Sequence, residues 1–275
     1  MEPASRRQGE QYLITDEDRT RFEEDGYLHL PDVLSEDEVA EIEDVYMRFL
    51  RREIPVTGRD FCDMSGDYDR PIEDYNIINV MLPRRYHEEW RGNPYETRAS
   101  SIAEQLIGPD LLIDYDQLLA KPPQKGQAVF HWHQDLAYWL DTPDPRTASF
   151  WLALDDTTVE SGCMRFVPGS HFEADLRPHH PLGDSREESH TLITEVGPDD
   201  EVRYAEIRRG DCTVHNQRVL HGSGGNTSMR WRRGYVVAYR SRATVEAERK
   251  AGFTHSHNDD DDVIGSVEAM QPPQS

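Results

Sequence analysis

The chain has 275 residues and a mass of 31.8 kDa, which fits one large domain or two small ones. Its formal net charge is −23, from 30 basic and 53 acidic residues. Such a surface repels nucleic acid and anionic membranes, so we expect neither as a partner. We interpret the acidity as a device for solubility, and an acidic docking face for another protein is the alternative.

Three cysteines, Cys62, Cys163 and Cys212, form no closely spaced pair, which argues against a disulfide framework. No apolar run is long enough to span a bilayer. The polar segment Met1 to Glu10 lacks the apolar core of a signal peptide. These features predict a soluble, cytoplasmic protein, and they leave its oligomeric state open.

The first part of the chain, to about residue 108, has the pattern of helices joined by irregular segments. Thr15-Asp16-Glu17-Asp18 is typical of a helix start, and Ser35-Glu36-Asp37-Glu38 is a capping box. Gly26–Leu30 alternates like a strand, and Pro94–Ile107 is a further predicted helix. Residues 59–75 form a long irregular segment that is either a surface loop or a lid.

From Leu111 the pattern changes to short strands separated by turns. The predicted strands are Leu111–Leu119, Ala128–Asp135, Thr147–Leu154, Cys163–Val167, His190–Thr194, Ala205–Ile207, Cys212–His215 and Gly234–Tyr239. Many short strands of this kind indicate a sandwich or a barrel. We predict one domain over residues 1–254, with a helical part at about 15–108 and a β core at about 109–245.

Residues 255–275 form the acidic end of the chain, with four consecutive Asp and a Gln-Pro-Pro-Gln-Ser ending. Such a composition cannot bury enough apolar surface to fold, so we predict a disordered tail. His255 and His257 within it could bind a metal adventitiously, and a solvated tail is the interpretation that we prefer.

The most informative stretch is Phe130-His131-Trp132-His133-Gln134-Asp135-Leu136. On an extended strand, His133 and Asp135 project to the same side. An imidazole and a carboxylate side by side can hold two positions of a divalent metal. A third ligand would complete the 2-His-1-carboxylate facial triad of non-haem Fe(II) oxygenases. The His-x-Asp spacing alone is a weak signal, because His257-Asn258-Asp259 repeats it.

The second informative stretch, from Gly210 to Asn226, combines a turn, a strand, His221 and a glycine-rich loop. A strand carrying His221 could lie beside the strand carrying His133 and complete the metal site. One of the arginines that follow could clamp the far carboxylate of a 2-oxo acid through two charge-assisted hydrogen bonds. The candidates are Arg230, Arg232 and Arg233. The residues alone leave open that His221 is a core histidine and that the arginines are surface residues.

Taken together, these segments resemble the phytanoyl-CoA dioxygenase family of Fe(II)- and 2-oxoglutarate-dependent oxygenases, over roughly residues 16–240. The matching segments are, in chain order, Phe22–Tyr27, Lys121–Pro123, His133–Leu136, Ser161–Cys163, Val167–His171, Gly210–Asp211 and His221–Ser223, with Asn226 and Arg232. The resemblance implies a mainly β fold, a double-stranded β-helix (a jelly-roll, cupin-like barrel) with flanking N-terminal helices.

The resemblance also implies the residues of the site. His133, Asp135 and His221 would hold Fe(II), and Arg232 would anchor the distal carboxylate of 2-oxoglutarate with help from Ser223. Further residues that would line the cosubstrate pocket are Gln134, Trp151 and Gln117. His215 would support the site without binding the metal, and His171 would shape a turn.

The implied reaction couples oxidative decarboxylation of 2-oxoglutarate by O2, giving succinate and CO2, to hydroxylation of a C–H bond in a small-molecule substrate. Asp135 stands where related halogenases carry Ala or Gly, so halogenation is not expected. Desaturation, epimerisation and cyclisation stay open. From other classes, a non-catalytic jelly-roll binding protein is an alternative. Arg232 and Ser223 argue against a cupin-type isomerase, which needs no dicarboxylate anchor.

Four variable segments are expected to contact the substrate, namely Cys62–Tyr75, Tyr86–Pro94, Tyr138–Arg146 and Glu173–Glu188. The first two segments are rich in acidic residues, namely Asp63, Asp67, Asp69, Glu73, Asp74, Glu88 and Glu89. This local acidity predicts a neutral or weakly charged substrate and not a coenzyme A thioester. A basic cluster of Arg84, Arg85 and Arg91 could nevertheless receive a phosphate.

Overall fold

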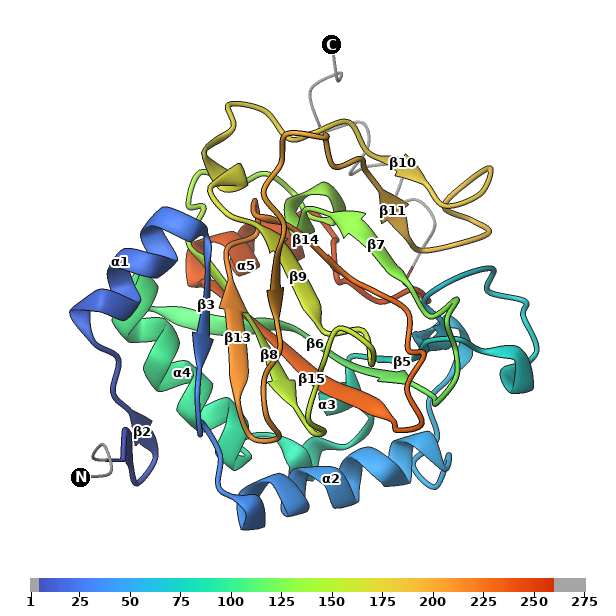
Figure 1. Cartoon of the computed structure of the whole chain (residues 1–275), viewed down its shortest axis with the longest axis horizontal. Helices are drawn as coiled ribbons and strands as arrows, with labels where there is room; N and C mark the ends of the chain where they lie inside the picture. Colours follow the sequence, from blue (N-terminus) through green and yellow to red (C-terminus); the bar gives the residue numbers. More distant parts are fainter. Residues whose placement is uncertain (1–4, 260–275) are drawn as a thin grey trace.

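The computed structural model describes residues 5–259, which form two main antiparallel β-sheets, two small two-stranded sheets and flanking helices (Figure 1). The α-helices are α1 Asp16–Asp25, α2 Glu36–Leu50, α3 Pro83–Tyr86, α4 Pro94–Ile107 and α5 Arg242–Lys250. The 3-10 helices are η1 Gly58–Asp60, η2 Ile72–Asp74, η3 Glu88–Trp90, η4 Asp135–Tyr138 and η5 Ser170–Phe172. The strands are β1 Arg7–Gln8, β2 Gln11–Tyr12, β3 Tyr27–Leu30, β4 Phe61–Asp63, β5 Ile78–Met81, β6 Leu111–Lys121, β7 Phe130–His133, β8 Thr147–Ala153, β9 Met164–Val167, β10 His180–Pro181, β11 Leu192–Ile193, β12 Arg203–Ala205, β13 Cys212–His215, β14 Leu220–Ser223 and β15 Arg232–Ser241.

The two main sheets face each other as the halves of a jelly roll. The larger sheet has the strand order β3-β13-β8-β15-β6-β5-β4, and the smaller has the order β12-β9-β14-β7. Trp151 of β8 packs between them against Met164 and Phe166 of β9. This arrangement confirms the predicted double-stranded β-helix with N-terminal helices. Within residues 5–259, no helix combines the length and the apolar character that crossing a bilayer requires.

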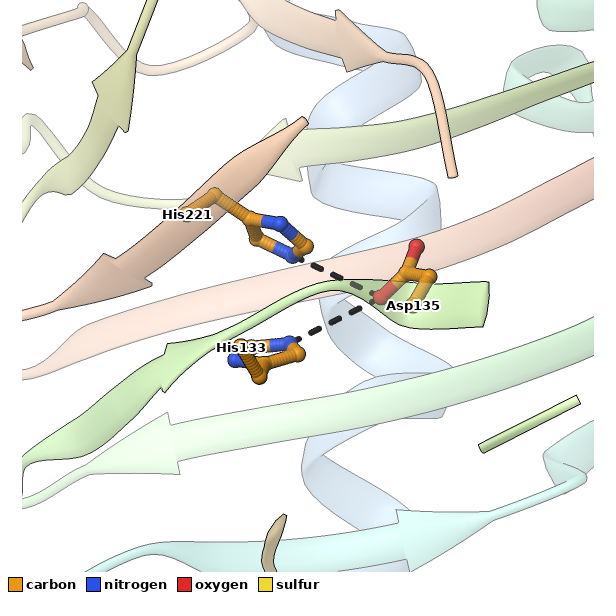
Figure 2. Close-up of side chains that lie close together, drawn as sticks. All are labelled: His133, Asp135 and His221. Atoms are coloured by element: carbon orange, nitrogen blue, oxygen red, sulfur yellow. Dashed lines mark ion pairs between the residues drawn. The ribbon is translucent and has the colours of Figure 1, made fainter. Parts of the chain in front are cut away.

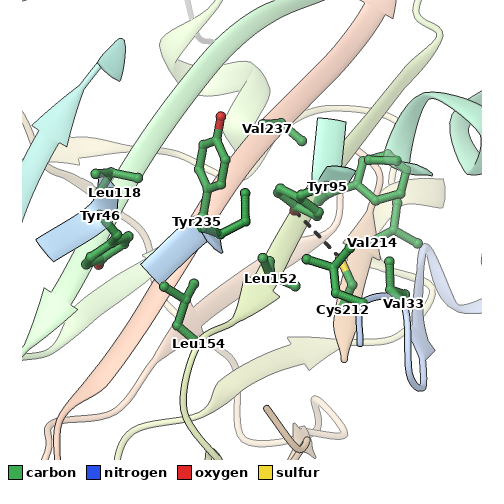
Figure 3. Packing of buried hydrophobic residues seen from close by; sticks show 14 of the residues in the cluster. Val33, Tyr46, Tyr95, Leu118, Leu152, Leu154, Cys212, Val214, Tyr235 and Val237 are labelled. Atoms are coloured by element: carbon green, nitrogen blue, oxygen red, sulfur yellow. Dashed lines mark hydrogen bonds between the residues drawn. The ribbon is translucent and has the colours of Figure 1, made fainter. Parts of the chain in front are cut away.

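The opposite face of the larger sheet is covered by α2 and α4 (Figure 3). Side chains alternate along a strand, so Tyr235 of β15 faces the helices while its neighbour Val236 faces the inside of the jelly roll. Tyr235 packs against Tyr95 of α4 in the same cluster as Tyr46 of α2, and all three are fully buried. Burial of each such side chain is worth roughly 1.5–3 kcal/mol. The helical layer therefore fixes the sheet whose inner face carries the site.

Several predicted boundaries are confirmed. Thr15 and Ser35 both form capping boxes, at the starts of α1 and α2. Asn93 caps α4 through the backbone N–H groups of Tyr95 and Glu96, and Gly108 ends the helix with a φ of 88°. These ends follow from local sequence because each cap satisfies backbone groups that the helix leaves unpaired.

Other elements differ from the prediction. β7 ends at His133, so Asp135 lies not on the strand but at the start of η4. β4 and β5 form an edge of the larger sheet within and after the segment that we predicted to be irregular. The buried carboxylate of Asp63 accepts hydrogen bonds from the backbone N–H groups of Ser65 and Ile77. These N–H groups therefore need no hydrogen bonds to water. That pairing is not visible in the local pattern.

The start of the predicted disordered tail is packed, so the predicted domain boundary at residue 254 is wrong. His255 lies 2.9 Å from Asp114 through its Nε2 atom. Ser256 donates a hydrogen bond to Asp60, and the backbone of His257 does the same at 2.9 Å. A buried carboxylate on each side therefore holds residues 255–257 against the β core. Residues 260–275 of the predicted tail lie outside the described residues.

Candidate iron and cosubstrate site

Three potential metal ligands meet between the two sheets. His133 at the end of β7 is paired with His221 on the neighbouring antiparallel strand β14. The Nε2 atoms of His133 and His221 lie 3.6 and 3.5 Å from Oδ1 of Asp135 (Figure 2). Gln134 keeps an extended backbone, so Asp135 projects to the side of His133 although the strand has ended. The structure thus brings together the three residues that the sequence singled out.

The two histidines are oriented by their backbones. Nδ1 of His133 lies 2.8 Å from the carbonyl oxygen of His131, and Nδ1 of His221 lies 2.9 Å from that of Val219. A carbonyl only accepts, so both Nδ1 atoms carry the proton and both Nε2 atoms keep a lone pair. Burial lowers the pKa of His221 well below its usual value, which keeps the ring in the neutral form that binds metals.

Asp135 is held as a carboxylate by its neighbours. Burial alone would raise its pKa, but His221, His133 and His215 lower the pKa well below the usual value whenever these rings carry a proton toward it. Its second oxygen, Oδ2, accepts a hydrogen bond from Ser149 of β8 at 2.9 Å and lies 3.2 Å from Nε2 of His215. Oδ1 is thus left to face the two histidines. The sequence suggested the supporting role of His215, whereas nothing in the sequence pointed to Ser149.

Arg232, the first residue of β15, lies in the same cavity as the three ligands. It is 1% exposed, and its Nε and Nη2 atoms have no hydrogen-bond partner among the described residues. Its guanidinium lies 4.1 Å from the ring centroid of Trp151. Burial lowers the pKa of Arg232 to about 10, so the group stays charged at neutral pH. A buried, unpaired charge is costly, and a carboxylate ligand would satisfy it.

The structure distinguishes between the three neighbouring arginines. Arg233 forms ion pairs with Asp155 at 2.7 Å and with Glu43 at 2.6 Å, on the outer face of the sheet. Arg230 is exposed and does not line the cavity. Alternation along β15 turns Arg232 inward where Arg233 turns outward. Arg232 is therefore the arginine available to a ligand.

Ser223 lines the cavity, and its hydroxyl oxygen accepts a hydrogen bond from the buried Lys121 at 2.6 Å. Lys121 also donates to the carbonyl oxygen of Gly224 at 2.7 Å. Burial, together with the charge of Arg232, lowers the pKa of Lys121 well below its usual value. The proton of the Ser223 hydroxyl is left free for an acceptor in the cavity. Lys121 matched the family pattern, but this contact was not predicted.

The other predicted cosubstrate residues divide into two groups. Trp151 and Gln117 line the cavity, as predicted. Gly234 gives Trp151 its space, because a Cβ atom there would lie 2.2 Å from the indole ring. Gln134 does not line the cavity. Its side chain lies on the opposite side of the chain from His133, where it donates to Arg218 at 2.6 Å and accepts from the backbone of Arg177 at 2.9 Å.

The cavity has a volume of about 410 Å³ and continues from the metal ligands toward a wall rich in aromatic side chains. Three of the four segments expected to contact the substrate contribute to it, whereas Tyr86–Pro94 contributes no residue. Arg59 and His190 were not predicted, nor was the C-terminal wall. That wall consists of Phe253, Thr254, His255, Ser256, His257 and Asp259.

A second group of histidine and carboxylate side chains, Asp114, Glu248 and His255, has the spacing of metal ligands. However, Nη1 of Arg240 lies 2.7 Å from Asp114 and 2.6 Å from Glu248, and Arg249 also pairs with Asp114. Burial would lower the pKa of His255, but Asp114 and Glu248 raise it above the usual value. The positions that a metal would take are already filled by positive side chains.

The jelly roll, the facial set of ligands and the buried free arginine together define an Fe(II)- and 2-oxoglutarate-dependent oxygenase. The family model described as "Phytanoyl-CoA dioxygenase (PhyH)" matches residues 22–234. The chain belongs to the phytanoyl-CoA dioxygenase family.

Known relatives agree with this assignment. Peroxisomal phytanoyl-CoA dioxygenase of Rattus norvegicus is 24% identical over 237 residues, covering 83% of this chain and 69% of the relative. The crystal structure of EvdO2 from Micromonospora carbonacea var. aurantiaca is 33% identical with a TM-score of 0.68, covering 83% of this chain and 91% of EvdO2. EvdO2 has also been solved in complex with 2-oxoglutarate. The α-ketoglutarate-dependent carbocyclase SnoK from nogalamycin biosynthesis is 28% identical with a TM-score of 0.64, covering 83% of this chain and 84% of SnoK.

Proposed function

We propose that this protein hydroxylates a C–H bond of a small metabolite. One molecule each of substrate, 2-oxoglutarate and O2 would give the hydroxylated product, succinate and CO2, which balances all atoms. The observation that carries the proposal is the position of Arg232, a buried guanidinium with two unpaired nitrogen atoms in the cavity of the three ligands. A binding protein without this reaction has no need for a dicarboxylate anchor beside a metal site.

His133, Asp135 and His221 would hold one Fe(II). Their donor set, two neutral imidazoles and one carboxylate, fits this ion and leaves coordination positions open. The bound ion supplies the oxidative decarboxylation of 2-oxoglutarate and the oxidation of the substrate C–H bond. Ser149 and His215 position the carboxylate of Asp135, because both contact its Oδ2 atom.

Arg232 and Ser223 would orient 2-oxoglutarate. The guanidinium provides parallel N–H donors for the distal carboxylate, and the hydroxyl of Ser223 provides another. Lys121 fixes that hydroxyl, and the ring of Trp151 supports the guanidinium from one side. Gln117 lies in the same wall and donates to Asn79 at 2.5 Å, which holds its amide in place. All of these side chains are buried, and a charge-assisted bond formed there would be stronger than one formed in water.

Ring closure is a second candidate reaction, because the similar structure SnoK is described as a carbocyclase. The same ligand set supports both outcomes, and the position of the substrate decides between them. Product analysis separates them. Hydroxylation adds an oxygen atom to the substrate, whereas ring closure removes two hydrogen atoms.

The proposal is tested by the conversion of 2-oxoglutarate to succinate. Purified protein is incubated with Fe(II), 2-oxoglutarate and O2, first alone and then with candidate substrates. We expect slow succinate formation without substrate and faster, stoichiometric formation with the correct one. Asp135→Ala should abolish both rates. Absence of any succinate from folded, iron-loaded wild-type protein would overturn the proposal.

A further inference from the structure

Two arginines lie in the cavity on the side away from Arg232. Arg59 belongs to η1, and Arg186 lies in the loop of the β10–β11 hairpin, which packs beside β7 (Figure 1). Within residues 5–259 neither has an ion-pair partner, although the chain has 53 acidic residues. The Nε atom of Arg186 is buried without a hydrogen-bond partner. Both charges are thus available to a ligand that enters the cavity.

A row of rings connects these arginines to the metal ligands. The ring of His133 lies 5.7 Å from Tyr138, which stacks on His190 at 5.1 Å. His190 stacks on His257 at 3.9 Å, and His257 meets Tyr68 at 5.7 Å. The guanidinium of Arg186 lies 5.5 Å from the centroid of Tyr138, and that of Arg59 lies 4.6 Å from the centroid of Tyr68. The two charges therefore flank one continuous aromatic wall.

The imidazoles in this wall add no charge at neutral pH. Burial, with Arg186 and Arg59 acting in the same direction, lowers the pKa of His257 to about 4 against the opposing influence of Asp60. Burial and the neighbouring positive groups also lower the pKa of His190 well below its usual value. The positive charge of the wall thus comes from the two arginines.

The structure removes the argument for a neutral substrate, which rested on acidic residues expected at the mouth of the cavity. None of the seven acidic residues that we assigned to the mouth lines the cavity. Two other carboxylates do so near its rim. Asp259 already contacts Thr254 and Arg85, and Glu187 is exposed and lies beyond ion-pair distance of either arginine. The proposed phosphate cluster is also neutralised, because Arg84 pairs with Glu96 and Arg91 with Glu88.

We propose that Arg59 and Arg186 form an anion subsite, so that the substrate has a flat ring-bearing body with a carboxylate or phosphate group. The ring would lie along Tyr68, His257, His190 and Tyr138, and the anionic group would lie between the two guanidinium groups. Aromatic walls favour flat rings, and guanidinium groups bind oxyanions through paired N–H donors. This inference rests on the proposed function, because it places the substrate in the cavity of the iron site.

The test uses probes that differ in charge and share one shape. Anaerobic, Fe(II)-loaded protein with saturating 2-oxoglutarate is titrated with 2-naphthoate and with 2-naphthamide in a calorimeter. We expect 2-naphthoate to bind at least about tenfold more tightly, since hydrogen bonds between charged partners are roughly twice as strong as neutral ones. A third probe, 2-naphthyl phosphate, shows whether the subsite prefers phosphate to carboxylate.

Variants then test whether the two arginines cause the preference for the acid over the amide. The double variant Arg59→Gln/Arg186→Gln should bind the acid and the amide equally, and Arg59→Lys/Arg186→Lys should retain part of the preference. The matched control is Arg146→Gln, which removes an arginine that pairs with Asp144 and does not line the cavity. It should behave as wild type. Equal affinities in the wild type, no binding of 2-naphthoate, or a preference that survives the double Gln variant would each overturn the inference.

The same preparations separate this inference from the proposed function. Succinate formation by the wild-type protein without any probe reports on the proposed oxygenase alone. If succinate forms and the charge preference is missing, the proposed function stands and the subsite does not. If the preference depends on both arginines and no succinate forms, the subsite stands without the proposed reaction.

Discussion

Two clusters within residues 5–259 bring histidine and carboxylate ligand atoms within 4.8 Å of one another, and their surroundings give them different chemistry. At His133, Asp135 and His221, no arginine or lysine in the described chain pairs with the carboxylate. At Asp114, Glu248 and His255, two arginines occupy the carboxylates. The first cluster can accept a cation, and the second already holds its cations as side chains.

The comparison shows that ligand types and spacing do not suffice to identify a metal site. The deciding feature is whether the negative charge is already compensated. Backbone carbonyls orient the imidazoles of the first cluster so that both Nε2 atoms face Asp135. In the second cluster, Nε2 of His255 is itself the group that pairs with Asp114. The first arrangement leaves its ligand atoms available to a metal ion, and the second fastens residues 255–257 to the β core.

The largest effect is expected at His221. His221→Ala removes one of the three proposed iron ligands and should lower turnover by more than about 100-fold, since even changes behind the ligands cost 10–100-fold. Iron content and succinate formation are the measurements. The control is His171→Ala, because His171 lies outside the cavity and contacts the backbone of Glu23. Full activity of His221→Ala would show that the first cluster is not the metal site.

The next largest effect on activity is expected at the proposed cosubstrate anchor. A hydrogen bond to a charged group contributes roughly 1.5–3 kcal/mol, so Arg232→Gln should raise the KM for 2-oxoglutarate by about 10–150-fold. Iron affinity should stay nearly unchanged, because Arg232 contacts none of the ligands. Arg233→Gln is the matched control, since Arg233 pairs with Asp155 and Glu43. A KM defect in the control but not in Arg232→Gln would reverse the assignment.

Substitutions at the second cluster should lower the stability of the fold and leave iron binding unchanged. Arg240→Met leaves Asp114 and Glu248 short of a buried partner and should lower the free energy of unfolding by about 3–5 kcal/mol. Denaturant titration measures this loss. Arg242→Met serves as the control and should change little, because its pair with Asp110 is exposed. Loss of iron from folded Arg240→Met protein would contradict the division between the clusters.

The smallest effect concerns pH. The pKa of His255 is raised in the folded protein, so its protonation stabilises the fold fully below the unfolded pKa of about 6.5. This contribution is lost as the pH rises through the folded pKa. At low pH, His255→Gln should lower the free energy of unfolding by about 1–3 kcal/mol. The difference from wild type should shrink as the pH is raised. A difference that is constant with pH would indicate that His255 is neutral.

The sequence predicted those parts of the site that depend on local order. The alternation around His133 and Asp135 and the strand with His221 could be read directly, and the family resemblance added Arg232, Ser223 and Trp151. Helix ends were also predictable, because caps such as Ser35 act within one turn. Each of these features depends on residues that lie close together in the sequence.

Contacts between distant segments were not predictable. Ser149 reaches Asp135 only because β8 and η4 meet in the folded jelly roll. The packing of His255 depends on Asp114, which lies 141 positions earlier in the chain. Composition made the described start of the tail, residues 255–259, look disordered, and the acidic residues around Asp67 made the mouth look negative. In both cases the outcome depended on which charges were already paired, and a count of residues does not contain that information.

The most direct test of this account is the Fe(II) stoichiometry of three folded proteins, measured by anaerobic equilibrium titration. The proteins are the wild type, His221→Ala in the first cluster and Glu248→Gln in the second. We predict one Fe(II) per chain for the wild type and for Glu248→Gln, and none for His221→Ala. Iron that remains bound to His221→Ala and is lost from Glu248→Gln would contradict the assignment of the metal to His133, Asp135 and His221.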